Sequence, residues 1–295
     1  MVQSRFIAVS IVITIGILWG LNWPAVKFVL HDVPPWTFRA IAFSCGGIVL
    51  GLIARMSGET LVVPPRDRVA ITLASLLTVL GFNIFTAFGQ LLTETSKAAI
   101  IAFTMPMWAA ILSAVFLGEK IGVNKGLSLL LGMSGLAVLL VSGGAEYISR
   151  PAGFLVMLGA AISWAAGTVL MKAHNWRIAP LARAAWLVGL SAPPTIIVAL
   201  LLEHPWTLPV PPLSVMAVMA FHVIGPVAIC YAAWTLLIAR LPASTAAIGT
   251  LLIPVVGVLS SSVLLGDQLT AAKLIALALI VASVAFVFVR PVKMS

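Results

Sequence analysis

Long apolar stretches alternate along the chain with short segments that carry prolines, glycines and charges. Each stretch has about 17 to 25 residues, the length that an α-helix needs to cross the hydrocarbon core of a bilayer. The connections are short, so consecutive helices should be neighbours. The pattern predicts an all-α membrane protein with ten transmembrane helices, over residues 6–30, 35–54, 69–92, 97–117, 124–142, 153–173, 182–202, 213–238, 244–265 and 271–290.

One stretch of this pattern occurs twice. Residues 241–267 align without a gap on residues 93–119, 148 positions earlier, and nine of the 23 positions from Ser96 to Gly118 are identical. The first span of each half matches more weakly, with Trp19 on Trp164 and Pro35 on Pro180. Such self-similarity is typical of a fold built from repeats. We therefore expect one integrated transmembrane domain made of two five-helix repeats, residues 1–145 and 146–295.

The number of spans in each repeat determines how the two repeats are oriented in the membrane. Five spans are an odd number, so the second repeat must enter the membrane from the opposite side, as in the inverted repeats of secondary transporters. Twelve Lys and Arg residues fall on the side of the N-terminus and five on the other side. By the positive-inside rule, both termini are predicted to be cytoplasmic and the protein to be a multi-pass protein of the bacterial inner membrane.

Composition supports this interpretation. Hydrophobic residues make up 62% of the chain and charged residues 8%, with a mean hydropathy of +1.18, whereas soluble domains carry about 25% charged residues. The net charge of +9 does not indicate a nucleic-acid partner, because the basic residues lie in loops between apolar runs. Cys45 and Cys230 lie inside apolar runs and are expected to be inert, with no metal or cofactor implied.

Several motifs resemble a known family. They are Trp19-Gly20-Leu21-Asn22 with Lys27 in the first span, Leu117-Gly118-Glu119-Lys120, and the stretch from Cys230 to Phe286. Together they are similar to EamA-type members of the drug/metabolite transporter superfamily, which implies ten spans in two inverted halves and transport of small metabolites. In length and aromatic content the chain resembles the YddG-type exporters of aromatic and neutral amino acids. Asp267 stands where the family commonly has Glu, which preserves the charge.

Prolines interrupt the two repeated helices at equivalent places. Pro106 and Pro254 each remove a backbone hydrogen bond and should bend their helix near mid-membrane. We expect these bends to act as hinges of two matched gates, and a static kink is the alternative. Small residues four apart, such as Gly16 and Gly20, are expected to serve helix packing.

Polar and aromatic residues within the spans are the candidates for a substrate site. Asn22 and Asn83 are either substrate contacts or interhelical hydrogen-bond partners, and Asn83 aligns with Tyr231 across the repeats. His222 is either a proton site or a satisfied histidine, and no carboxylate follows it as a relay. The basic residues Lys27, Arg39, Lys97 and Lys172 fall near span ends, which disfavours phosphorylated substrates. The substrate-binding set is predicted to be Trp19, Asn22, Asn83, Phe85, Trp108, Trp164, Tyr231 and Trp234.

Three classes of function remain to be weighed. The pattern favours a carrier that exports aromatic or neutral amino acids by alternating access, and efflux of hydrophobic or cationic drugs is the alternative within that class. An intramembrane enzyme is disfavoured because HExxH, GxSxG and paired mid-membrane aspartates are missing, so no catalytic residue is proposed. A structural membrane protein would not need matched bends. The expected partners are the substrate and lipid, with a monomer or weak homodimer as the assembly.

Overall fold

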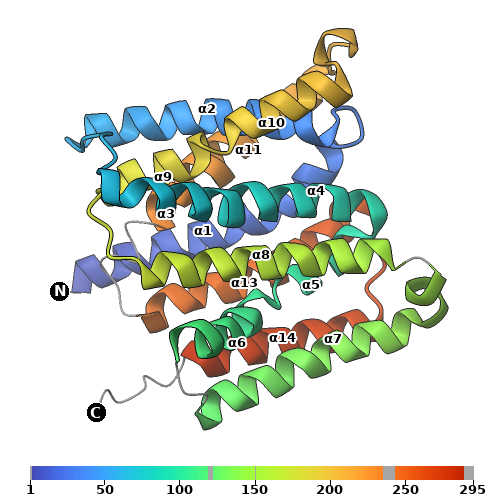
Figure 1. The fold of residues 1–295 in the computed structure, drawn as a ribbon. Helices are drawn as coiled ribbons and strands as arrows, with labels where there is room; N and C mark the ends of the chain where they lie inside the picture. The colour runs from blue at the N-terminus through green and yellow to red at the C-terminus, as the bar shows by residue number, and fades with distance from the viewer. Residues whose placement is uncertain (1, 119–121, 150, 235–242, 289–295) are drawn as a thin grey trace.

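The computed structural model describes residues 2–118, 122–149, 151–234 and 243–288, and within these segments every regular element is helical (Figure 1). The first half contains α1 (Val2–Val29), α2 (Pro35–Met56), α3 (Arg68–Ala74), η2 (Ser75–Gly81), α4 (Phe82–Leu92), α5 (Thr95–Ala102), α6 (Met105–Leu117) and α7 (Val123–Ser149). The second contains α8 (Ala152–Ala173), α9 (Pro180–Gly189), α10 (Ala192–Val198), η3 (Ala199–Glu203), α11 (Leu213–His222), η5 (Val223–Ile229), α13 (Ala243–Leu265) and α14 (Ala271–Phe288). Short η1 (Pro65–Asp67) and η4 (Pro205–Thr207) lie in the connections.

The helices are long and apolar enough for a membrane protein. In the described ranges, six continuous helical segments have the length and hydropathy of a membrane span, and four further apolar helices are shorter. These ten segments lie where the hydrophobic pattern predicts spans. The number ten and the side of the membrane on which the termini lie stay predictions.

The two halves interleave instead of forming separate bodies. The most extensive helix contacts pair α1 with α13, α7 with α14, α2 with α9, and α4 with α8, and each pair joins one helix from each half. Figure 1 shows these helices running side by side, with the start of α1 and the end of α14 at the same side of the bundle. The core of the protein is therefore an interface between repeats.

Carboxylates cap the α2–α9 pair reciprocally. Both oxygens of Glu203, at the end of η3, accept hydrogen bonds at the start of α2: from the backbone N–H of Trp36 at 3.0 Å, and from the N–H and hydroxyl of Thr37 at 2.6 and 2.7 Å. Glu59, after α2, accepts from the Ala182 N–H at the start of α9 at 2.8 Å. Negative charge is favourable at a helix N-terminus, where amides lack partners. Each half thus completes the first turn of a helix in the other.

Two π-helical segments repeat at the same interval as the sequence. η2 (Ser75–Gly81) and η5 (Val223–Ile229) lie 148 positions apart, in the third and eighth predicted spans. Such segments are rare and are frequent at functional sites. Asn83 and Tyr231 each follow one of them by two residues, so the same distortion of the helix presents both side chains.

The two proline helices differ from each other. In the first half the predicted helix is broken: α5 ends at Ala102 and α6 begins at Met105, just before Pro106. The second-half helix α13 runs from Ala243 to Leu265 without a break and contains Pro254. The expected pair of equal bends is therefore realised as one break and one continuous helix.

Candidate functional site

A partly open pocket of about 390 Å³ lies between the two halves. Its walls come from α1, α2, α4, the break between α5 and α6, α6, α8, α11, η5, the helical residues that follow η5, and α13. Six of the residues predicted to bind substrate line it: Trp19, Asn22, Asn83, Trp164, Tyr231 and Trp234. Pro106 and His222 line it as well. The volume falls in the range of small-molecule sites.

Three predicted residues lie outside this lining. Phe85 is 40% exposed, and its ring lies against Gly159 of α8. Trp108 donates from its indole nitrogen to the Thr104 hydroxyl at 3.2 Å, so it connects α6 to the break that precedes it. Pro254 is buried within α13. These positions give Phe85 and Trp108 packing and hydrogen-bonding roles next to the pocket.

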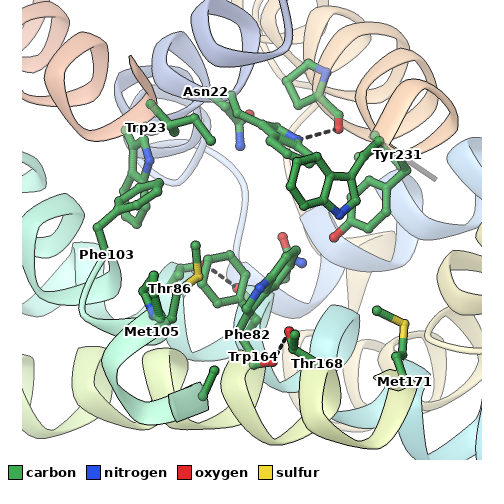
Figure 2. Close-up of a pocket in the computed structure, with 18 of the residues that line it drawn as sticks. Asn22, Trp23, Phe82, Thr86, Phe103, Met105, Trp164, Thr168, Met171 and Tyr231 are labelled. Carbon is green, nitrogen blue, oxygen red and sulfur yellow. Dashed lines mark hydrogen bonds between the residues drawn. The ribbon is translucent and has the colours of Figure 1, made fainter. Parts of the chain in front are cut away.

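Aromatic rings form two opposing walls of the pocket. Trp19 packs edge-on against Tyr231 and Trp234, with ring centroids 5.9 and 5.8 Å apart. The Trp19 indole nitrogen donates to the carbonyl of Pro226 at 2.9 Å, which fixes the ring against η5. Phe82 and Trp164 pack edge-on at 4.9 Å, and Figure 2 shows them across the pocket from Asn22 and Tyr231. Such rings accept a flat apolar solute.

Side chains next to the π-helical segments add polar groups to these walls. Asn83 donates from Nδ2 to the Val79 carbonyl at 2.8 Å, inside η2. Its side chain is also within hydrogen-bonding reach of Tyr231. The two residues that align across the repeats in sequence therefore meet in space.

Arg39, His222 and Asn22 form a buried chain of hydrogen bonds at another part of the pocket wall. Arg39 Nη1 lies 3.1 Å from His222 Nε2, and His222 Nδ1 lies 2.6 Å from Asn22 Oδ1. Arg39 and His222 are each only 1% exposed, and all three residues line the pocket. Of the four basic residues expected near span ends, Arg39 and Lys172 line the pocket. The long side chain of Arg39 reaches it from the first turns of α2.

This geometry bears on the predicted proton role of His222. A guanidinium can only donate, so the His222 Nε2 that faces it must accept. The ring proton is then on Nδ1, from which it is donated to the oxygen of Asn22. A second proton, on Nε2, would point at the guanidinium, so the arrangement favours a neutral imidazole that positions Arg39.

Ionic contacts between the halves lie beyond one end of the pocket. Glu94 pairs with Lys273 of α14 and, at 3.3 Å, with Lys97. Burial alone would raise the pKa of the Glu94 carboxyl, but the two lysines outweigh it and hold the pKa below its usual value. Asp267 accepts from the Ser96 N–H at 2.7 Å and so completes the first turn of α5. At this end Lys27 also donates to the Gln90 carbonyl.

Several lining residues were not singled out by the sequence pattern. They include Trp23, Arg39, Phe82, Thr86, Gln90, Phe103, Met105, Thr168 and Met171. Most are apolar residues in apolar helices, where only the fold distinguishes a pocket wall from a lipid-facing surface. Arg39 could have been predicted from the sequence to face inward. A charged residue five positions into a span is costly unless it faces the interior of the bundle.

Comparison with known proteins agrees with this architecture. The chain matches the EamA-like transporter family over residues 6–141 and again over residues 151–289. It is 32% identical to the uncharacterized transporter YvbV of Bacillus subtilis over 276 residues, which cover 92% of this chain and 88% of that protein. It is 26% identical to a probable amino-acid metabolite efflux pump of Salmonella typhimurium over 297 residues, 95% of this chain and 93% of that one. A solved crystal structure shares the fold, with a TM-score of 0.70, 24% identity and 96% of each chain covered.

A multi-pass helical bundle with a solute-sized pocket between its two halves defines a membrane transporter of the bacterial inner membrane, not an enzyme. The protein belongs to the EamA-like transporter family, with two matching repeats in one chain.

Proposed function

We propose that the protein exports small neutral or aromatic amino acids, or close metabolites, by alternating access between its two inverted five-helix repeats. The observation that carries the proposal is the pocket itself. It lies where the repeats meet, and its walls are mostly apolar with several aromatic rings. The side chains that align across the repeats, Asn83 and Tyr231, face each other in it. A relative at 26% identity carries the name of a probable amino-acid metabolite efflux pump, which is consistent with this substrate class.

Efflux of cationic drugs is the second candidate and fits the site less well. In the described part of the chain the pocket lining contains no Asp or Glu, while it does contain Arg39. A cation would meet a positive charge and no counter-charge. The charge of the wall therefore favours a substrate with a carboxylate or a neutral substrate.

Counterflow in proteoliposomes tests the proposal. Vesicles loaded with unlabelled phenylalanine, tryptophan, leucine or alanine should accumulate the same labelled amino acid transiently, and protein-free vesicles should not. We expect the aromatic amino acids to give the largest overshoot, because the rings of Trp19 and Trp164 can pack against them. If no amino acid gives an overshoot while a cationic dye does, the drug-efflux alternative replaces this one.

A further inference from the structure

The wall of the pocket holds a guanidinium that has no counter-charge among the described residues. Arg39 is 1% exposed and lines the pocket from α2. Arginine keeps its charge in proteins, so this side chain brings a fixed positive charge into an apolar site. The ring of Phe38 packs against it, with the ring centroid 4.7 Å from Arg39 Cζ.

The acidic residues whose side chains the structure describes are engaged elsewhere. Glu203, the acidic side chain at the start of α2, accepts from Trp36 and Thr37, and no described ion pair joins it to Arg39. The others lie in connections or at helix ends, away from the pocket lining: Asp32, Glu59, Asp67, Glu94 and Asp267. A buried charge without a counter-charge is costly, and a ligand anion in the pocket would remove that cost.

The described hydrogen bonds of Arg39 leave its Nε–H without a partner. Nη1 is satisfied by His222 Nε2, and His222 is held in turn by Asn22. Arg39 Nε is buried and has no hydrogen-bond partner in the described residues. The chain of three side chains thus fixes the orientation of the guanidinium while Nε–H remains available. A carboxylate can accept two parallel hydrogen bonds from such a fork.

We propose that Arg39 binds the carboxylate of the transported substrate, with His222 and Asn22 as positioning residues. The proposal rests on the proposed function and names the group that distinguishes its substrates. The aromatic rings of Trp19, Phe82 and Trp164 receive the rest of the molecule. Arg39 is the buried cation of the lining, whereas Lys172 is exposed. One buried guanidinium matches one singly charged carboxylate, and a phosphate dianion would require more donors.

Binding of a matched pair of small acids tests the anchor without transport. Phenylacetate and phenylacetamide differ only in the charged group, and tryptophans in the pocket wall report their binding by fluorescence of the purified protein. We expect phenylacetate to bind at least about tenfold more tightly than phenylacetamide, as the loss of a charge-assisted hydrogen bond implies. In Arg39→Gln the two affinities should become equal. Arg55→Gln, an exposed arginine in the last turn of the same helix, should retain the wild-type preference.

The positioning residues have their own test. Arg39→Lys keeps the charge but not the fork, and His222→Leu keeps the guanidinium but removes its support. Both should retain part of the preference for phenylacetate and lose affinity for it, while their affinity for phenylacetamide stays at the wild-type value. A merely structural role would weaken both ligands together.

The wild-type comparison stands even if Arg39→Gln does not fold. Equal wild-type affinity for the acid and the amide, or an Arg39→Gln protein that keeps the preference, overturns the anchor. This outcome leaves the proposed function intact if counterflow of amino acids succeeds. Conversely, carboxylate binding that depends on Arg39 in a protein that moves no amino acid keeps the anchor and removes the amino acid as its substrate.

Discussion

At the scale of single residues, glycines at the helix crossings allow the two halves to approach closely. A Cβ on Gly47 of α2 would lie 2.9 Å from Gly189 Cα and 3.2 Å from its backbone nitrogen, at the crossing with α9. A Cβ on Gly20 of α1 would lie 2.5 Å from Val256 Cβ on α13, in agreement with the packing role expected for Gly20. Both crossings join the halves and carry pocket residues, Arg39 on α2 and Trp19 on α1.

Gly47→Ala should therefore destabilise the protein. The clash is with backbone, which cannot turn away, so we expect a loss of about 1–3 kcal/mol from overpacking. Gly51→Ala, one turn further along α2, is the matched control, because its Cβ would meet only Leu61 Cδ1 at 3.7 Å. Thermal unfolding in detergent compares the two variants. Equal melting temperatures for them would show that α2 and α9 separate without cost.

At the scale of elements, the site depends on distortions of helices more than on their presence. The π-helical segments η2 and η5 precede Asn83 and Tyr231, and the break between α5 and α6 exposes Pro106 to the pocket. Pro106 has no N–H to donate to the carbonyl of Ala102, and the chain leaves the helix at that point. Pro254 lacks the same donor, yet α13 continues past it.

The two prolines should consequently differ as hinges. Pro106→Ala restores the missing donor and favours continuation of α5 into α6, so we expect substrate exchange to slow several-fold. Pro254→Ala should change the rate less, because its helix is already continuous. Exchange rates in proteoliposomes, compared at equal protein content, measure both. The hinge hypothesis fails if Pro106→Ala exchanges substrate at the wild-type rate with unchanged thiol accessibility from both sides.

The helices and part of the site can be predicted from the sequence, but several features of the site cannot. Hydrophobic length locates the helices, because each must span a bilayer, and the 148-residue repeat brings Asn83 and Tyr231 into register. The contact of Arg39 with His222 depends on how α2 rotates against α9, which no local pattern specifies. The caps from Glu203 and Glu59 join residues more than 100 positions apart, and π-helical segments leave no simple mark in apolar sequence.

At the scale of the whole molecule, polar contacts join the two halves at both ends of the pocket. The Asp267–Ser96 contact and the Glu94–Lys273 pair lie at one end. At the other end, just beyond Lys172 of the lining, Asp67 accepts from the backbone N–H groups of Arg177 and Ile178 and pairs with His174. An alternating-access carrier needs contacts at one end to break while equivalent contacts form at the other. By the repeat, the equivalents of Asp267 and Ser96 are Glu119 and Ser244; Glu119 lies outside the described residues, and the Ser244 side chain is not described.

Two-sided access to the pocket is the central claim, and thiol labelling tests it most directly. With Cys45 and Cys230 replaced by serine, a single cysteine is placed at Thr86 in the pocket wall or, as a control, at Ser57 in the exposed connection after α2. A membrane-impermeant maleimide is then applied to intact cells and to inside-out vesicles, with and without phenylalanine. We predict that the Thr86→Cys protein reacts from both sides and the Ser57→Cys protein from the cytoplasmic side alone. Reaction of the Thr86→Cys protein from only one side, whatever the substrate, would contradict alternating access through this pocket.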